Sequence, residues 1–335
     1  MADFYDYTEG YRFSKFLKFT KSSGTNQSKM LKKFFLKIAA YAGLTLGFCF
    51  LLQSLVAPKI RNTNVFVGAT IEKEKRLAEL PAPRLVFVGG SNLAFGLDSK
   101  QIADSLHVEV ANMGLHAGLG VAFGLNEAKD FIKQGDKIIL SVEYGLTKKG
   151  DTKLFAQLID INPNAARYLN GSINDKLRLI GINWQRCVSS LFFSAILNPN
   201  EAVYKRDGFS KEGDMIAHLN QPQTAHLMNM GKMVFRDYSD EINTMNAFID
   251  FANQKGAKVY YTFPAYIESE YKLNKSVIAQ YEKQFQEQLK CPIINTPQSF
   301  VFPNADFFDT AYHLDKNGRE KRTQIMITLL KNKVM

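Results

Sequence analysis

The chain has 335 residues, of which 46% are hydrophobic and 22% are charged, a balance typical of a protein that buries a core and not of a disordered one. Its net charge is +10, but residues 1–37 hold half of this excess, with eight basic and three acidic side chains. The remaining chain has no basic stripe interleaved with aromatic residues, which argues against a nucleic-acid partner.

The first predicted element is an apolar helix over residues 38–57. These residues carry no charge, and Lys32, Lys33 and Lys37 precede them. At about 1.5 Å per residue, such a helix is long enough to cross the hydrocarbon core of a bilayer. A buried core helix is a weaker alternative because the segment has no amphipathic period. A cleaved signal peptide is another, with Leu55-Val56-Ala57 as a weak cleavage site.

The basic residues around this segment predict its orientation. By the positive-inside rule, residues 1–37 stay in the cytoplasm and the chain after Pro58 is exported. We therefore expect a single-pass protein of the cytoplasmic (inner) membrane with its N-terminus inside and its working domain outside. Residues 58–83 are predicted to be a stalk with one short helix, because they are charged and end in Pro81-Ala82-Pro83.

The three cysteines have no metal-ligand spacing. Cys49 lies in the apolar segment, so Cys187 and Cys291 are the only pair that could form a disulfide in an exported domain. Two free thiols are an equally good expectation, and no metal site is predicted.

From about Arg84 onward, short apolar runs alternate with helical segments. The predicted strands are Leu85–Gly89, His107–Ala111, Lys137–Val142, Lys258–Phe263 and Pro292–Asn295. The predicted helices are Val121–Lys133, Lys275–Leu289 and Asp315–Lys331. This alternation is typical of a parallel sheet covered on both faces. We predict a flavodoxin-like three-layer α/β/α domain over residues 84–335, with a mostly helical cap inserted at about 145–255.

Residues suited to acyl transfer follow three of the predicted elements. Gly89-Gly90-Ser91-Asn92 follows the first strand, Asn112-Met113-Gly114 follows the second, and Asp309 and His313 lie near the C-terminus. The carboxyl ends of parallel strands share one edge of a sheet, where ligands bind. A serine, a turn of backbone donors and an acid–base pair are the groups that acyl transfer requires, although a glycine-serine turn alone is common.

These blocks resemble the SGNH (GDSL-like) hydrolase superfamily, in particular the membrane-anchored branch that works with membrane-bound O-acyltransferases on cell-envelope polysaccharides. Gly89-Gly90-Ser91 matches the first block with glycine in place of the family's aspartate, Asn112-Met113-Gly114 matches the second, and the segment from Asp309 to His313, with Leu314 and Gly318, resembles the last. The similarity covers roughly residues 84–330.

The resemblance implies a role for each block. Ser91 would attack the acyl carbon, His313 would take its proton, and Asp309 would orient the imidazole. The N–H groups of Ser91 and Gly114, with Asn112 beside them, would hold the oxyanion. No cofactor, metal or nucleotide is implied.

Two positions differ from the family pattern. Active hydrolases supply an asparagine to the oxyanion hole after the third strand, whereas this chain has Glu143 in Ser141-Val142-Glu143-Tyr144, and a carboxylate donates a hydrogen bond only when protonated. Asp309 and His313 are four residues apart where three is usual, so Asp306 and Glu143 are alternative orienting groups. The residues expected to line the crevice are Asn92, Glu143, Tyr144, His116 and Tyr312.

The remaining histidine, tryptophan and glycine-containing segments have simpler predicted roles. His107 is expected to pack within the second strand, and Trp184 is expected in the core rather than as a sugar platform. The segments Tyr204–Phe209 and Gly213–His218 resemble segments of the same polysaccharide-linked branch. Either they pack as a glycine-turned loop through Phe209 and Met215, or they close the active-site crevice.

The expected function is an extracytoplasmic O-acyl or O-acetyl transferase, or an esterase, acting on a cell-envelope or secreted polysaccharide. Such an enzyme would have the polymer and a membrane-bound O-acyltransferase as partners. The alternative from another class is an inactive SGNH-like scaffold that binds a glycan or the acyltransferase. Glu143 discriminates between them, because a carboxylate aimed at Ser91 favours the scaffold and one paired with a cation favours the enzyme. A nucleotide binder ranks third, since no phosphate-cradling glycine loop leads directly into a helix.

Overall fold

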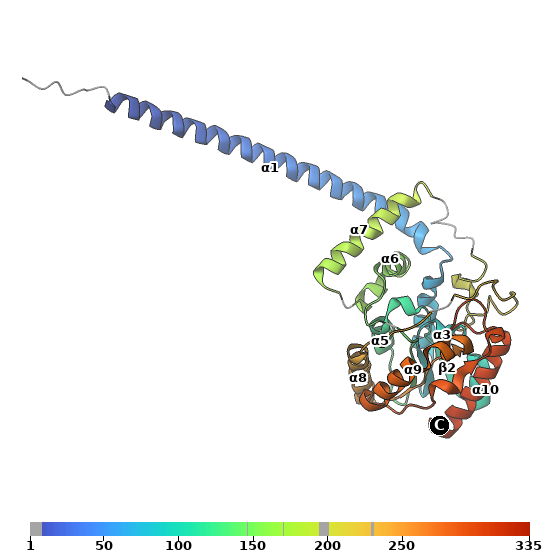
Figure 1. The fold of residues 1–335 in the computed structure, drawn as a ribbon. Helices are drawn as coiled ribbons and strands as arrows, with labels where there is room; N and C mark the ends of the chain where they lie inside the picture. The colour runs from blue at the N-terminus through green and yellow to red at the C-terminus, as the bar shows by residue number, and fades with distance from the viewer. Residues whose placement is uncertain (1–8, 146, 170, 194–200, 229–230) are drawn as a thin grey trace, which may run out of the picture. The chain divides into compact units, whose positions relative to one another are not determined.

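A computed structural model of the chain describes residues 9–145, 147–169, 171–193, 201–228 and 231–335. The chain divides into two compact units, Met1–Val56 and Ala57–Met335. Most of the first unit lies in helix α1 (Glu9–Arg61), drawn in blue in Figure 1. Within the described residues, only the part Gln27–Arg61 forms a helix long and apolar enough to cross a membrane, and its most apolar stretch is not buried. This excludes a core helix, whereas a membrane anchor and a signal sequence both fit.

The second unit is built on a parallel four-stranded sheet. Its strands are β1 (Arg84–Gly89), β2 (Glu109–Asn112), β3 (Lys137–Ser141) and β4 (Lys258–Tyr261), in the order β2-β1-β3-β4. All three neighbouring pairs are parallel. The interiors of β1 and β3 are almost wholly apolar because both faces of a parallel sheet are covered. The predicted α/β class and parallel sheet are confirmed.

Two strand predictions were wrong in detail. The second strand begins at Glu109, because His107 ends helix α4 (Ser99–Leu106) in the left-handed conformation with φ 51°. His107 therefore lies outside the strand and is exposed. The segment around Ile293 runs beside β4 through a single parallel bridge to Tyr261 and forms no full strand.

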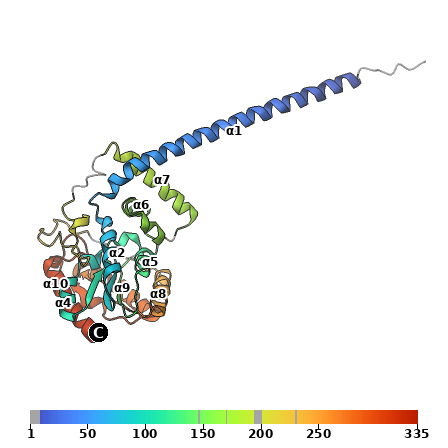
Figure 2. The same cartoon turned by 180° about the vertical axis from the view of Figure 1, so that it is seen from behind.

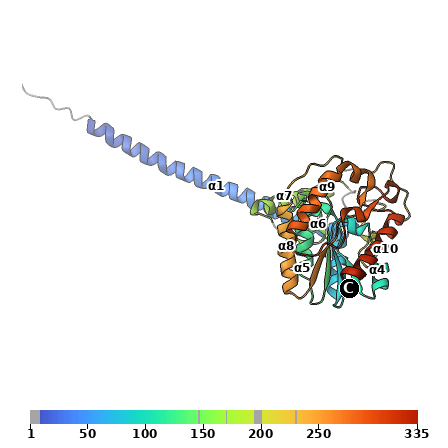
Figure 3. The same cartoon turned by 60° about the horizontal axis from the view of Figure 1, so that its bottom comes forward.

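Helices cover both faces of the sheet, as Figure 3 shows. Helices α5 (Val121–Lys129) and α8 (Ser239–Gln254) pack against each other on one face, and α9 (Glu268–Gln288) contacts α8. Helices α4 and α10 (Lys316–Lys333) pack together on the other. Ser91 begins a short helix, α3 (Ser91–Ala94), directly after β1. The loops after β1 and β3 therefore meet at one edge of the sheet.

The region 145–255 is only partly the helical cap that was expected. Helices α6 (Thr152–Ile161) and α7 (Ile173–Ser190) pack against each other, and Figure 2 shows them from behind. The described residues from 201 to 238 have little regular structure beyond the short turn Arg206–Gly208. Helix α8 belongs to the layer that covers the sheet, since it packs on α5 and β4.

The segment expected to be a stalk contributes buried residues to the second unit. It contains a 3-10 turn, η1 (Phe66–Ala69), and helix α2 (Thr70–Glu79). Helix α2 packs against β2, and Leu77 belongs to the main apolar core. Cys187 and Cys291 are free, buried thiols, which agrees with the expectation of two free thiols.

Candidate active site

A tight hairpin brings Asp309 and His313 together. Phe307 and Leu314 form an antiparallel bridge, and the Phe308 N–H donates to the His313 carbonyl oxygen at 2.8 Å. The chain between them doubles back, so side chains four residues apart lie side by side. His313 Nδ1 is 2.8 Å from Asp309 Oδ1. Because a carboxylate only accepts, Nδ1 carries the proton in this bond and Nε2 is left free to accept one.

Tyr204 is the third member of this cluster. Its hydroxyl donates a short hydrogen bond to Asp309 Oδ2 and lies 3.1 Å from His313 Nδ1. Burial and the adjacent Asp309 raise the pKa of Tyr204, so the phenol stays protonated and remains a donor. Burial opposes the charge on Asp309, but the hydrogen bonds from His313 and Tyr204 and the positive charge of the imidazolium outweigh it and lower the pKa of the carboxyl. Asp309 is therefore an anion at neutral pH.

Helix α3 links Ser91 to His313. Phe95 follows the last residue of this helix, and its ring stacks on the imidazole of His313 with centroids 4.0 Å apart and planes 10° apart. Ser91 and Phe95 are four residues apart, and the Phe95 N–H donates to the Ser91 carbonyl oxygen at 2.9 Å. Ser91 and His313 also line the same cavity.

One large cavity contains these residues. It has a volume of about 750 Å³. Its walls include Ser91, His313, Asp309, Glu143, Tyr144, His116, Tyr312, Tyr204, Phe66 and Met228. The cavity thus brings together all three expected catalytic residues and four of the five residues expected to line the crevice. The fifth, Asn92, is fully buried behind the wall.

Among the residues that the structure describes, Ser91 forms no hydrogen bonds through its hydroxyl or its N–H at this wall of the cavity. The residue is half-buried. Both groups are therefore available to a ligand in the cavity.

The other two expected oxyanion groups lie differently. The Gly114 N–H donates to Asn112 Oδ1 at 2.9 Å, and Asn112 Nδ2 donates to the Leu93 carbonyl oxygen and to Asp214. Asn112 is fully buried, and neither Asn112 nor Gly114 lines the cavity. In this structure they support the turn that carries Ser91.

Glu143 lies beside the same turn. Its Oε1 accepts the Asn92 N–H at 2.8 Å, and its Oε2 is buried with no partner among the described residues. A Cβ atom at position 90 would overlap the Glu143 carboxylate, so only glycine leaves room for it. The carboxylate of Glu143, in the loop after β3, thus occupies the space that a side chain at position 90 would need.

Asn92 and Arg322 tie the serine turn to the rest of the domain. Arg322, on α10, is fully buried and donates to the Asn92 carbonyl oxygen and, at 3.0 Å, to Asn92 Oδ1. The Ser141 hydroxyl donates to Asn92 Oδ1 at 3.1 Å. Burial lowers the pKa of Arg322 to about 9, and the charge of Glu143 opposes this shift. No ion pair within 4.0 Å joins Arg322 and Glu143 among the described residues, so Glu143 influences Arg322 through its charge rather than by direct pairing.

The remaining expected residues form the rim. His116 Nδ1 accepts the Gly118 N–H at 2.9 Å, and the His116 side chain is exposed at the mouth of the cavity. The Tyr312 hydroxyl donates to the Tyr144 carbonyl oxygen at 3.2 Å, which fixes one wall. Asp306 is paired with Lys321 at 2.7 Å, so it does not orient His313.

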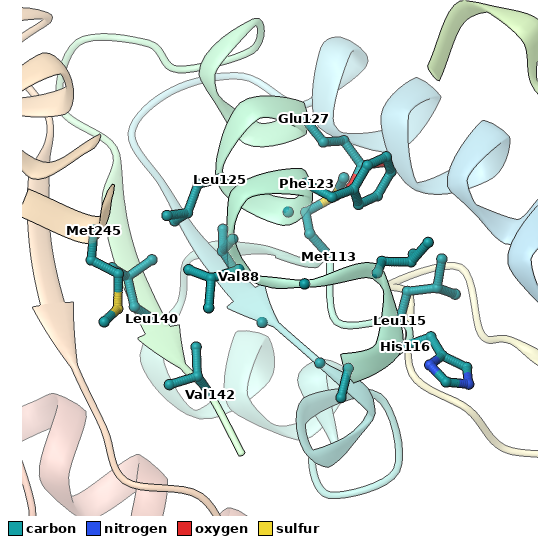
Figure 4. Close-up of a pocket in the computed structure, with 17 residues that line it drawn as sticks. Val88, Met113, Leu115, His116, Phe123, Leu125, Glu127, Leu140, Val142 and Met245 are labelled. Atoms are coloured by element: carbon teal, nitrogen blue, oxygen red, sulfur yellow. The ribbon is translucent and has the colours of Figure 1, made fainter. Parts of the chain in front are cut away.

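A second, smaller cavity lies behind this wall. Figure 4 shows its apolar lining, which includes Val88, Met113, Leu115 and Val142, with His116 at one side. Its volume of about 30 Å³ holds only one or two water molecules, so it is too small for a substrate.

Sequence reasoning missed Tyr204, Phe95 and Arg322 as site residues. Tyr204 was visible only as part of a segment singled out by resemblance. Phe95 and Arg322 reach the site through tertiary contacts that no local pattern reveals. Phe209 packs on Phe66 with centroids 5.1 Å apart and Met215 is fully buried, so the segment both packs as a loop and supplies a cavity residue.

The part of the chain that the structure describes holds no group of three or more His, Cys, Asp or Glu side chains placed to bind a metal. No protein-family model matches the chain, and no curated protein is significantly similar to it.

His218 provides a pH-dependent prediction. It is buried, Nε2 lies 2.9 Å from the Leu314 carbonyl oxygen, and burial lowers its pKa to about 4. Below the unfolded-state pKa of about 6.5, His218 is protonated in the unfolded chain but stays neutral in the folded chain. The free energy of unfolding therefore falls as the pH falls toward 4. From pH 7 to pH 5 this one group should cost about 2 kcal/mol of unfolding free energy.

The measurement is the unfolding midpoint at pH 7 and at pH 5. His218→Gln keeps a donor for Leu314 but cannot titrate, so it should lose clearly less stability on acidification than the unmodified chain. His107→Gln, at an exposed histidine, should behave like the unmodified chain. Equal acid sensitivity of His218→Gln and the unmodified chain would contradict this assignment.

Proposed function

We propose that the protein is an extracytoplasmic acyl-ester enzyme that transfers or removes O-acyl groups on a cell-envelope or secreted polysaccharide through a Ser-His-Asp mechanism. The observation that carries the proposal is the Asp309–His313–Tyr204 cluster facing the cavity whose wall also holds Ser91. A base with an anionic orienting partner beside an uncommitted hydroxyl is the arrangement that activates a serine.

The fold supports this proposal. The sheet order β2-β1-β3-β4, with a bridging segment beside β4, is the order of flavodoxin-like domains. The Ser91 turn follows β1, the Asn112 turn follows β2 and Glu143 follows β3, so the three blocks meet at the carboxyl edge of the sheet. This placement matches what resemblance to SGNH hydrolases implies.

The chemistry proceeds in two steps. The Ser91 Oγ attacks the acyl carbon as its proton moves to His313 Nε2, and the alcohol of the donor leaves with that proton, which forms an acyl-serine ester. An incoming hydroxyl then gives its proton to Nε2 and attacks the acyl carbon, the bond from that carbon to Ser91 Oγ breaks, and Nε2 returns the proton to Oγ. The incoming group is a sugar hydroxyl in a transferase and water in an esterase. Asp309 holds the imidazole by Nδ1 throughout.

The free N–H of Ser91 is the donor best placed for the oxyanion. A negative Glu143 near this point would oppose the developing charge, yet Arg322 partly balances it. Because the Glu143 carboxylate stands beside Gly90, we infer that it replaces the aspartate of the family's first block rather than the asparagine of its third.

The proposed location follows from α1. A long apolar helix with a basic N-terminal flank fits a membrane anchor whose downstream domain is exported. An enzyme held there would meet envelope polymers and a membrane-bound O-acyltransferase that supplies acyl groups.

One observation favours a second function, a scaffold that binds a glycan or the acyltransferase without catalysis. The Asn92 and Gly114 N–H groups are both committed to internal acceptors, which leaves the oxyanion hole with few donors. Under this alternative, the cavity is a binding site only.

The two functions differ in how substitutions combine. If Ser91 and His313 act in one proton transfer, Ser91→Ala, His313→Ala and the double variant should each abolish nearly all activity to the same extent. The measurement is the acyl content of the envelope polymer in cells that carry each variant, with protein level checked in parallel. Thr152→Ala, at a residue outside the cavity, serves as the control. Unchanged acylation with Ser91→Ala at normal protein level would establish the scaffold instead.

Tyr204 gives a graded test of the cluster. Tyr204→Phe removes one hydrogen bond to the Asp309 carboxylate, a bond to a charged group that is worth roughly 1.5–3 kcal/mol, so activity should fall by about tenfold or somewhat more. Because the Tyr204 hydrogen bond lowers the pKa of Asp309, its loss should raise that pKa, so activity should fall off at a higher pH on the acid side of the pH–activity profile. An unchanged profile together with unchanged activity would show that Tyr204 does not act on this pair.

A further inference from the structure

Helix α7 has two apolar faces, and the domain covers only one. Its buried face, formed by Leu179, Asn183, Cys187 and Ser190, belongs to the side that packs on α6. A second stripe runs along Ile173, Leu177 and Ile180, whose side chains are 70%, 60% and 66% exposed. The spacing of four and three residues places them on one line of the helix.

The apolar stripe continues to the C-terminal end of α7 and into the residues that follow it. Trp184 lies four residues after Ile180 and is half-buried, and Leu191, Phe192 and Phe193 follow at 56–76% exposure. Exposed apolar side chains are common singly, but a contiguous row of this length on a folded domain indicates a contact surface.

Cations surround the N-terminal half of this stripe. Lys148, Lys149, Lys153, Lys176 and Arg178 are exposed. Lys149 reaches Asp175 at 3.9 Å, and residues 148–150 line one hollow together with Asp175 and Leu179, so the lysine loop lies against α7. An apolar stripe bordered by lysine and arginine is the pattern of a helix that lies in the surface of an anionic membrane.

The link between the apolar segment and the second unit is short, which fits a membrane surface as the binding partner of the α7 stripe. Eight residues separate Ala57, the last residue of the apolar segment, from Phe66 in η1, so the two are at most about 30 Å apart. Helix α6 contacts both η1 and α7, so α7 is linked through α6 to the first turn of the second unit.

We propose that α7 is an interfacial membrane helix. Ile173, Leu177, Ile180 and the aromatic end Phe192-Phe193 enter the boundary between headgroups and acyl chains, and the neighbouring lysines contact lipid phosphates. The proposal rests on the membrane anchoring in the proposed function but not on its chemistry. A second copy of the chain or a partner protein would not require the cationic border, so anionic phospholipid is the occupant that the charges favour.

The chain carries its own probe, because Trp184 is its only tryptophan. The full chain is reconstituted in vesicles of phosphatidylcholine and phosphatidylglycerol, with or without bromine on the lipid acyl chains. Brominated lipid should remove most of the Trp184 emission, and less when phosphatidylglycerol is omitted. Flotation of the vesicles reports separately whether the chain is anchored.

The test variant is Ile173→Ser/Leu177→Ser/Ile180→Ser, which changes only exposed side chains, so the fold should persist. The matched control is Leu273→Ser on α9, an exposed leucine at 52% outside the stripe. The triple variant should lose the quenching while still floating, and the control should keep it.

Each outcome is decisive. Flotation without quenching of the unmodified chain overturns this proposal alone and leaves the anchor and the acyl chemistry untouched. Equal quenching in the triple variant also overturns it. A chain that does not float contradicts the anchor on which both this proposal and the proposed location depend.

Discussion

The candidate site depends on a buried arginine. Arg322 has almost no access to water, and its guanidinium must be satisfied by the protein because an unpaired buried charge is strongly unfavourable. Its two terminal nitrogens donate to the carbonyl and side-chain oxygens of Asn92, the residue after Ser91, whereas its Nε is buried with no partner among the described residues. The charge of Glu143 also favours the charged guanidinium. This polar cluster joins α10 to the ends of β1 and β3, so the position of Ser91 is set by the whole domain rather than by its own loop.

A second structure, the hairpin from Phe307 to Leu314, holds the acid–base pair independently of that cluster. Its backbone bridge fixes Asp309 opposite His313, and the Tyr204 hydroxyl donates a hydrogen bond to the second carboxylate oxygen of Asp309. Phe95 connects the two structures by stacking on the imidazole. The stacked Phe95 ring therefore links the helix that begins at Ser91 to the hairpin that carries His313, and such contacts resist displacement in a close-packed interior.

The sequence predicted those features that depend on local pattern. Buried apolar runs marked β1, β3 and β4, and small residues after β1 and β2 marked the carboxyl edge of the sheet. The pairing of Asp309 with His313 was predicted although the two are four residues apart rather than three. The hairpin explains it, because its two arms bring the side chains together. His107 misled the assignment of β2, because a left-handed helix end is set by the backbone of α4 and not by side-chain polarity. Tyr204 and Arg322 lie 105 and 230 residues from the site residues they contact, Asp309 and Asn92, and only the folded chain brings them there.

The central claim is that His313 activates Ser91. A fluorophosphonate probe measures this most directly, because it forms a bond only with a serine whose proton is being removed. The account predicts that the full chain is labelled on Ser91 alone, as located by mass spectrometry of its peptides, and that His313→Ala abolishes labelling while Ser276→Ala, at an exposed serine of α9, leaves it intact. Absence of labelling in the folded chain, or labelling that survives His313→Ala unchanged, would contradict the account.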